Sequence, residues 1–261
     1  MHKMYSDRSA TKKQMLQASQ QYESTGDVKY KNMIPKLHNK QMALKIALNS
    51  AYGAVGNQYF RFYDIRIAEA VTYGGQLSIR WIEKSLNKHL NELLQTDNVD
   101  YVLASDTDSV YITFDTLIER LNPKDPVKFL DTICTEKLEP FIDGEYQRLA
   151  EYVNAYEQKM FMKREVIADK GIWTAKKRYI LNVHNSEGVQ YAEPKLKMMG
   201  IEAVKSSTPQ VCRDKIKDAL KVIMSGDEND LNDFIQDFRK EWMGMDAASI
   251  AFPRSCNGMK K

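Results

Sequence analysis

The stretch Tyr101-Val-Leu-Ala-Ser-Asp-Thr-Asp-Ser-Val-Tyr-Ile-Thr-Phe114 decides the fold of this chain. It contains two short runs rich in Val, Ile, Tyr, Phe and Thr, joined at Asp106-Thr107-Asp108. Side chains alternate between two largely apolar faces along each run, which is typical of strands that are at least partly buried on both sides. The stretch therefore predicts a β-hairpin with a tight turn.

The two aspartates of this turn allow two interpretations. Carboxylate oxygens are hard ligands that suit Mg²⁺ or Mn²⁺, so a divalent cation would compensate the charges of Asp106 and Asp108. Aspartate is also common in turns because its side chain hydrogen-bonds the local backbone. The turn alone leaves metal binding and simple turn formation open.

The composition is that of a globular protein. With 261 residues, 43% of them hydrophobic and 28% charged, the chain is long enough for one large domain or two small ones. The sequence contains no run of about 18 apolar residues and no signal-peptide core, which excludes a membrane span. Cys134, Cys212 and Cys256 lack paired spacing, which argues against a zinc site or a disulfide framework and fits a reducing cytosol.

The net charge of +3 is unevenly distributed. Basic residues gather in residues 1–45 and again between Lys170 and Lys205, whereas Asp227–Asp237 is acidic. Segregated basic surfaces favour a polyanionic partner, for which phosphate is the obvious candidate. For any single cluster, however, the solvated face of a helix is the commoner outcome.

The first fifty residues predict a basic helical hairpin. Residues 3–23 are predicted to be a helix, residues 24–27 a turn, and a second helix is expected from near Pro35 to Tyr52, where Gly53 ends it. Arg8 and Lys12 are four residues apart, so they share one face of the first helix.

Three polar residues form a stripe on the second of these helices. Lys45, Asn49 and Tyr52 follow an i, i+4, i+7 spacing. A cation for phosphate, an amide for a polar edge and an aromatic ring for a base or sugar together suit a nucleotide. The same spacing also describes an ordinary amphipathic surface, and that alternative stays open.

Further elements are predicted along the rest of the chain from its apolar periodicity and its turn residues. They are an extended segment or strand at 57–64, a long helix at 65–94, a helix at 127–154 kinked at Pro140, a strand at 159–168 followed by Gly171, a hairpin of 173–183 and 189–191 around Asn185–Gly188, and helices at 207–224 and 230–242.

Three stretches resemble motifs of family B DNA polymerases. Lys45-Ile-Ala-Leu-Asn-Ser-Ala-Tyr-Gly53 resembles their fingers-helix motif, Ser105-Asp-Thr-Asp-Ser109 their palm carboxylate motif, and Trp173-Thr-Ala-Lys-Lys-Arg-Tyr179 their primer-contacting segment. The resemblance covers nearly the whole chain. Residues 60–64, 193–200 and 205–209 look most like the replicative polymerases of T-even-type tailed phages.

The resemblance implies an α+β fold in three parts. Residues 1–53 would form the helical fingers hairpin, residues 54–192 a partial palm in which helices accompany an antiparallel sheet, and residues 193–261 a truncated helical thumb.

The resemblance also implies residue roles. Asp108 matches the aspartate that ligates both catalytic metals, Asp106 matches its partner, and Glu165 resembles a further carboxylate near the metals. Lys163 stands where the phage enzymes tend to carry a second acidic residue. The remaining residues match positions of two kinds. Those that bind the incoming nucleotide are Arg8, Lys12, Lys45, Asn49, Tyr52 and Gly53, and those that bind primer-template DNA are Lys176, Lys177, Arg178 and Tyr179.

The implied activity is template-directed nucleotidyl transfer from a dNTP to a primer 3′-OH. It would use two Mg²⁺ ions, or Mn²⁺ in their place, during DNA replication in the cytoplasm of an infected bacterium. Family B enzymes take their other metal-bridging aspartate from an Asp-x-x-Ser-Leu-Tyr-Pro motif, which this sequence lacks. We therefore expect the carboxy-terminal part of a split or truncated polymerase, inactive alone. A second polypeptide would carry the amino-terminal, exonuclease and first palm segments.

Two other functions compete with this one. A non-catalytic remnant of a polymerase would keep the basic residues and bind DNA without chemistry. A metal-dependent glycosyltransferase would use Asp106 and Asp108 as its Asp-x-Asp pair, but it leaves the stripe on the second helix and residues 173–179 unexplained.

Overall fold

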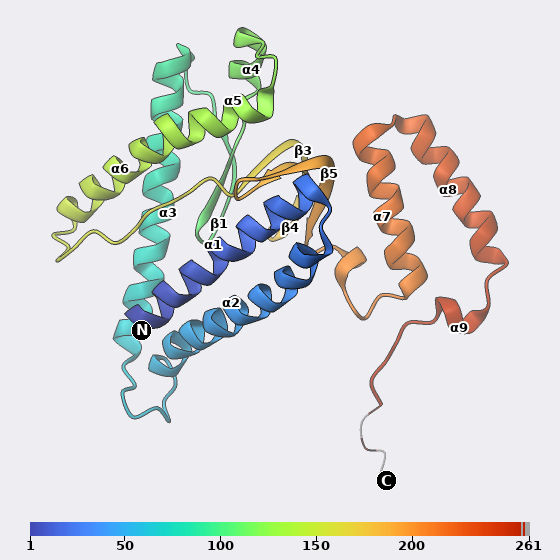
Figure 1. Ribbon diagram of the computed structural model, residues 1–261, viewed down its shortest axis with the longest axis horizontal. Coiled ribbons are helices and arrows are strands. Elements are labelled where there is room, and N and C mark those ends of the chain that lie inside the picture. The colour runs from blue at the N-terminus through green and yellow to red at the C-terminus, as the bar shows by residue number, and fades with distance from the viewer. Residues whose placement is uncertain (257, 259–261) are drawn as a thin grey trace. The chain divides into compact units, whose positions relative to one another are not determined.

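The computed structural model describes residues 1–256 and 258. Helices and two small antiparallel sheets make up the fold, which confirms the α+β class (Figure 1). The chain forms two compact units, Met1–Ile167 with Asn185–Ala192, and Ala168–His184 with the chain from Glu193 onward. Within the described residues, no helix is long and apolar enough to cross a membrane.

Helices α1 (His2–Thr25) and α2 (Val28–Val55) form the predicted hairpin. Gly26 ends α1 with a left-handed φ of 67°. The Asp27 side chain caps α2 by accepting a hydrogen bond from the N–H of Lys29 at 2.8 Å.

The predicted bounds of the second helix are wrong at both ends. Pro35 lies inside α2 rather than at its start, and Gly53 does not stop the helix, which continues to Val55. Proline removes the donor to the carbonyl four residues earlier, here that of Lys31. Both residues are exposed, so water can bond that carbonyl. The side-chain cap at Asp27 had already fixed the start of the helix.

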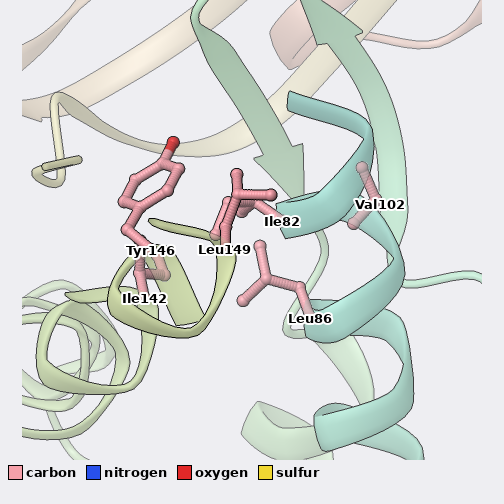
Figure 2. Packing of buried hydrophobic residues seen from close by; sticks show 6 residues of the cluster. All are labelled: Ile82, Leu86, Val102, Ile142, Tyr146 and Leu149. Atoms are coloured by element: carbon pink, nitrogen blue, oxygen red, sulfur yellow. The ribbon is translucent and has the colours of Figure 1, made fainter. Parts of the chain in front are cut away.

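Helix α3 (Ile65–Leu94) is the central element of the first unit, as the sequence predicts. Its buried positions recur every four residues, at Ser78, Ile82, Leu86, Leu90 and Leu94. Figure 2 shows two of them, Ile82 and Leu86, packed with side chains from a neighbouring strand and helix. The other residues of that core cluster are Val102, Ile142, Tyr146 and Leu149.

The segment before α3 is not a strand. Residues 57–64 form consecutive turns, in which the N–H of Phe60 bonds the carbonyl of Asn57 and the N–H of Tyr63 bonds the carbonyl of Phe60. These local bonds satisfy backbone groups that a strand would have directed to a neighbour.

The predicted hairpin is present as β1 (Val102–Asp106) and β2 (Ser109–Ile112), which pair antiparallel with Asp106 opposite Ser109. Helices α4 (Asp115–Leu121), α5 (Pro126–Ile133) and α6 (Glu139–Tyr152) follow.

A π-helical turn, Cys134–Leu138, joins α5 to α6. The irregularity that the sequence places at Pro140 therefore lies just before this proline. Pro140 falls in the first turn of α6, where its missing N–H has little cost.

The three strands of the second sheet are β3 (Val166–Ala175), β4 (Arg178–Ser186) and β5 (Val189–Met199), in the order β3-β4-β5. The predicted strand at 159–168 is largely wrong, because residues 159–165 are not in a strand and β3 runs on through Gly171. A turn at Lys176-Lys177 also divides the predicted strand 173–183. The turn at Glu187-Gly188 agrees with the prediction.

The second unit has its own apolar core. Ile180, Ile201, Ala203, Leu220 and Met224 are buried together. The last two belong to α7 (Gln210–Ser225), which packs on α8 (Glu228–Met243), and a short α9 (Ala247–Ile250) follows. The predicted helices at 207–224 and 230–242 are confirmed.

One carboxylate is built into the core of the first unit. Glu145 of α6 is buried and accepts hydrogen bonds from Trp81 Nε1 at 3.1 Å, Ser85 Oγ at 2.8 Å and Arg148 Nη1 at 2.6 Å. Burial acts to raise the pKa of this carboxyl, but the bonds from Ser85, Arg148 and Trp81 outweigh it and hold the pKa below its ordinary value. The ionised group thus ties α6 to α3.

We expect Glu145→Gln to lower the free energy of unfolding by about 1–3 kcal/mol in urea denaturation, because the amide cannot satisfy all three donors. Since the folded pKa is depressed, the contribution of Glu145 is present above the ordinary value of 4.5 and is lost as pH falls through the folded pKa. Loss of stability between pH 5 and 3 should therefore be shallower in the variant. Glu151→Gln, on the exposed side of the same helix, is the control, and equal effects would contradict the prediction.

Candidate functional site

The two predicted metal ligands stand on one tight turn. Asp106 is the last residue of β1 and is half-buried, while Asp108 is exposed. Thr107 between them has a φ of 56°. The N–H of Asp108 donates to the Asp106 carbonyl at 2.6 Å, and Thr107 Oγ1 donates to Asp106 Oδ1 at 3.0 Å. The structure thus brings both carboxylates to the same end of the hairpin.

Two asparagines of α3 fix where this hairpin begins. Asn87 Oδ1 accepts the N–H groups of Tyr101 and Val102 at 2.8 and 3.1 Å. Asn91 pairs with the backbone of Val99, accepting its N–H at 2.9 Å and donating to its carbonyl at 2.7 Å. These amides hold the start of β1 against α3, and the register of the strand then determines where the aspartate turn falls.

The aspartate turn lies near the edge of the apolar core. Burial raises the pKa of Tyr146, and the negative charge of Asp108 raises it further. In Figure 2 the Tyr146 ring belongs to the cluster while its hydroxyl points beyond it. The charge of Asp108 therefore acts against ionisation of this hydroxyl.

Asp106 and Asp108 fit part of a magnesium site. Mg²⁺ is commonly held by one or two carboxylates, completed by waters and substrate phosphates. Within residues 1–256 and 258, no group of three or more His, Cys, Asp or Glu side chains could hold a metal. Glu165 is exposed just before β3, and no hydrogen bond within this part of the chain joins it to the aspartates.

The basic residues of the helical hairpin lie at matching heights. Arg8 precedes Gly26 by 18 residues and Lys45 follows Asp27 by 18 residues. At the rise of an α-helix, both stand about 27 Å from the turn. Lys45 and Asn49 are exposed.

Arg8 and Lys12 are both half-buried. The Arg8 Nε atom is shielded from solvent and has no hydrogen-bond partner among the described residues. Lys12 Nζ forms an ion pair with Glu187 Oε1 at 2.5 Å. One cation of this pair therefore lacks an acceptor at Nε, and the other is occupied by a carboxylate.

The last two predicted nucleotide-binding residues lie near the end of α2. The Tyr52 hydroxyl shares a hydrogen bond with Thr72 Oγ1 at 2.9 Å and donates to the Ala68 carbonyl at 3.4 Å, both on α3. Gly53 is exposed inside α2. The Tyr52 ring is thus anchored at its hydroxyl and remains 47% exposed.

The predicted DNA-binding residues surround the β3–β4 turn in the second unit. Lys176 and Lys177 form the turn and are exposed, as is Arg178, which pairs with Glu202 at 3.6 Å. Tyr179 is buried, and its ring lies 6.4 Å from that of Trp173. The side chains that this turn presents to solvent are therefore the three cations.

Gly200, directly after β5, supports the same turn. Its φ is 65°, and a Cβ there would lie 2.4 Å from the Lys177 carbonyl oxygen. Only glycine allows the backbone to pass so close to the turn.

Several of these supporting residues are not apparent from the sequence. Asn87 and Asn91 show an i, i+4 amide spacing, but no pattern names their backbone partners. Glu187 precedes Gly188 in a turn signal, yet its pairing with a lysine 175 positions away follows only from the fold. Gly200 is the last residue of the segment 193–200 that resembles the phage polymerases. The sequence does not show that its backbone lies against the Lys177 carbonyl.

Comparison with known proteins finds similarity to DNA polymerases. The model of DNA polymerase family B matches residues 1–122. The chain is 38% identical over 238 residues to the DNA-directed DNA polymerase of Enterobacteria phage T4, and 41% identical over 235 residues to that of Escherichia phage RB69. These alignments cover 86% and 85% of this chain and 26% of each phage protein. A shorter similarity, 33% over 78 residues, covers 30% of this chain and 7% of the DNA polymerase delta catalytic subunit of Drosophila melanogaster.

Residues 1–122 of this chain thus resemble DNA polymerase family B, and most of the chain is similar to the two phage DNA polymerases. It spans about a quarter of the length of the phage relatives that it matches. The range matched by the family model includes the helical hairpin and the Asp106–Asp108 turn together, which the glycosyltransferase alternative does not account for.

We expect Gly200→Ala to destabilise the second unit by about 2 kcal/mol or more, because the new Cβ meets the Lys177 carbonyl and the backbone also has positive φ. Gly188→Ala is the matched control. Its φ is 87°, but a Cβ there meets nothing within 4 Å, so only the conformational cost of about 1 kcal/mol remains. Hydrogen exchange at residues 175–179 measures the local effect. Equal losses in the two variants would show that the close approach is unimportant.

Proposed function

We propose that this chain provides the nucleotide-binding helices and one carboxylate turn of a DNA polymerase active centre. In the presence of the rest of a polymerase, it transfers a nucleotidyl group from a dNTP to a primer 3′-OH. The observation that carries the proposal is that the family match spans both the cationic hairpin and the aspartate turn. Residues 1–53 then act as fingers, 54–192 as part of the palm and 193–261 as the beginning of a thumb.

Asp108 and Asp106 are the residues that would hold the divalent metal. Bound Mg²⁺, or Mn²⁺ in its place, would neutralise phosphate charge and favour the deprotonated primer hydroxyl. Asp108 is exposed, so a cation can reach its oxygens from solvent, and Asp106 is half-buried two residues before it. Glu165, with an exposed carboxylate, is a candidate for a supporting role near the metals.

The helical hairpin would bind the triphosphate. Arg8, Lys12 and Lys45 offer three cationic groups, and Arg8 and Lys45 stand at the same height on the hairpin. Charge-assisted bonds from such groups to phosphate oxygens are stronger than neutral ones. Asn49, one turn beyond Lys45, adds an amide, and Tyr52 with Gly53 would lie near the nascent base pair.

The β3–β4 turn would contact the primer. Lys176, Lys177 and Arg178 are exposed cations that suit backbone phosphates or the acceptors of the minor groove. Tyr179 is buried beside Trp173, which supports a role in holding the turn rather than in direct contact.

An exposed apolar surface supports the requirement for further polymerase segments. Phe62, Ile67, Val71, Tyr73 and Leu77, in the turns before α3 and in its first half, are all 43% exposed or more. Such surfaces commonly mark an interaction site. We propose that the remainder of the polymerase, on a longer chain or on a second polypeptide, covers this surface and brings further metal ligands. The phage relatives suggest that the reaction occurs in the cytoplasm of an infected bacterium.

The test uses a chimera in which this chain replaces the segment that it matches in the phage RB69 polymerase. We expect the chimera to extend a primed template with dNTP and Mg²⁺, and the isolated chain not to do so. Asp108→Asn should slow the chimera roughly a hundred-fold or more, since a carboxylate that binds the cation is lost.

Asp97→Asn, in the exposed loop before β1, is the control for removal of one negative charge. Unchanged extension by the Asp108→Asn chimera would refute the proposed role of the turn. A chimera and an isolated chain that both bind primer-template in a salt-dependent manner without extension would instead favour the non-catalytic remnant.

A further inference from the structure

The ion pair between Lys12 and Glu187 joins two distant parts of the first unit. Lys12 lies on α1 and Glu187 in the β4–β5 turn, with 2.5 Å between Nζ and Oε1. Their side chains are 33% and 23% exposed. At this partial burial the attraction is screened less than in an ordinary surface pair. The contact therefore contributes to holding α1 in place.

The turn that carries Glu187 is braced on both sides. Glu187 and Gly188 have φ values of 50° and 87°. The N–H of Glu187 donates to the Glu165 carbonyl at 2.5 Å. Asn185 Oδ1 accepts the N–H of Gly188 at 3.2 Å and Arg164 Nη1 at 2.7 Å. Glu187 is consequently presented to α1 by a turn with a fixed backbone.

A second contact shows that the pairing is part of a docking arrangement. The N–H of Gln190 donates to Gln20 Oε1 at 2.9 Å, eight residues further along α1 than Lys12. Two points on one helix thus meet two points on one β-hairpin. Lys12 is held by this geometry and not by a chance encounter of two long side chains.

Glu187 occupies the position that an anionic ligand of Lys12 would take. Arg8, one turn earlier on α1, has a shielded Nε with no acceptor among the described residues. Without a ligand, Lys12 is thus paired with a carboxylate, while Arg8 Nε has no acceptor among the described residues. A triphosphate that reaches Arg8 must share Lys12 with Glu187 or displace it.

We propose that Glu187 is an internal competitor for Lys12: it holds the lysine and α1 in the nucleotide-free protein, and the incoming triphosphate takes its place. The inference rests on the proposed function of Lys12 in triphosphate binding. Glu187 acts through Lys12 and is a positioning residue, not a catalytic one. It lowers nucleotide affinity in proportion to the fraction of molecules in which Glu187 occupies the lysine. After the phosphate leaves, it returns α1 to the β4–β5 hairpin.

The test measures binding of dATP and of inorganic tripolyphosphate, each with Mg²⁺, to the purified chain by calorimetry at low ionic strength. Glu187→Gln keeps the size of the side chain and removes its charge, so we expect binding to tighten about two- to five-fold, the range of a partly exposed ion pair. Lys12→Ala should weaken binding. In the Lys12→Ala background Glu187→Gln should have no effect, because the two residues act on the same interaction. Glu119→Gln, exposed on α4, controls for the change in net charge.

A second measurement follows Lys12 directly. Acetylation by an amine-reactive ester, quantified by mass spectrometry, should be slower at Lys12 than at the adjacent exposed Lys13. Glu187→Gln should raise the Lys12 rate several-fold, and dATP should lower it again in that variant. Equal rates at Lys12 in the two proteins would overturn the inference.

The outcomes separate the two proposals. If the wild-type chain binds tripolyphosphate and Glu187→Gln does not tighten binding, or tightens it equally without Lys12, the competition is refuted while nucleotide binding stands. If no variant binds either probe, as the purified chain or within the phage RB69 chimera, the proposed nucleotide function fails, and the competition that rests on it fails as well. In that case, faster acetylation of Lys12 in the Glu187→Gln variant would show only that the ion pair has a structural role.

Discussion

Burial along one stripe of α3 is the constraint on which the first unit depends. Ile82 and Leu86 are completely buried, and each such side chain contributes about 1.5–3 kcal/mol by removing apolar surface from water. The residues beside the stripe are polar and bond outward. Ser85 reaches Glu145 of α6, and Asn87 reaches the start of β1. One helix therefore fixes both its neighbouring helix and the strand that ends in the aspartate turn.

The acidic residues of this unit have different roles because their environments differ. Glu145 is buried and has three donors, so its charge is satisfied by the protein itself. Asp108 is exposed, and its charge raises the pKa of Tyr146 at the edge of the core. Glu187 is paired with a lysine of another element. Of the three, Asp108 is the carboxylate with charge left for a ligand.

The sequence predicts most accurately those elements that are set by local periodicity. The helix at 65–94 has its observed bounds, since its buried positions repeat every four residues. The hairpin at Asp106–Asp108 also follows from alternation and turn chemistry. The predicted start of α2 near Pro35 is wrong, because a proline in an exposed helix turn is tolerated when a capping residue upstream has already fixed the start of the helix.

Tertiary contacts account for the failures. Residues 159–165 have strand composition, but their backbone bonds go elsewhere. The N–H of Arg164, for example, donates to Glu139 Oε1 at 3.0 Å. A strand needs a neighbour, and composition alone does not say whether one is present. For the same reason the sequence indicated Lys12 as a candidate but not the Glu187 that holds it. Partners between distant segments follow from the fold and not from spacing.

The backbone of the aspartate turn is strained at its central residue. Thr107 has a φ of 56°, a region that β-branched residues rarely occupy and where glycine is the usual choice. Strain of this kind costs on the order of 1–3 kcal/mol and persists only where the surroundings impose it. Here it is imposed by the pairing of β1 with β2 and by Asn87, whose side chain accepts the Tyr101 N–H at the start of the hairpin. A plain turn former would be better served by glycine at this position. Thr107 instead adds a hydroxyl that donates to Asp106 Oδ1, which orients one of the two carboxylates. A strained turn that orients a carboxylate supports the ligand site proposed for Asp106 and Asp108.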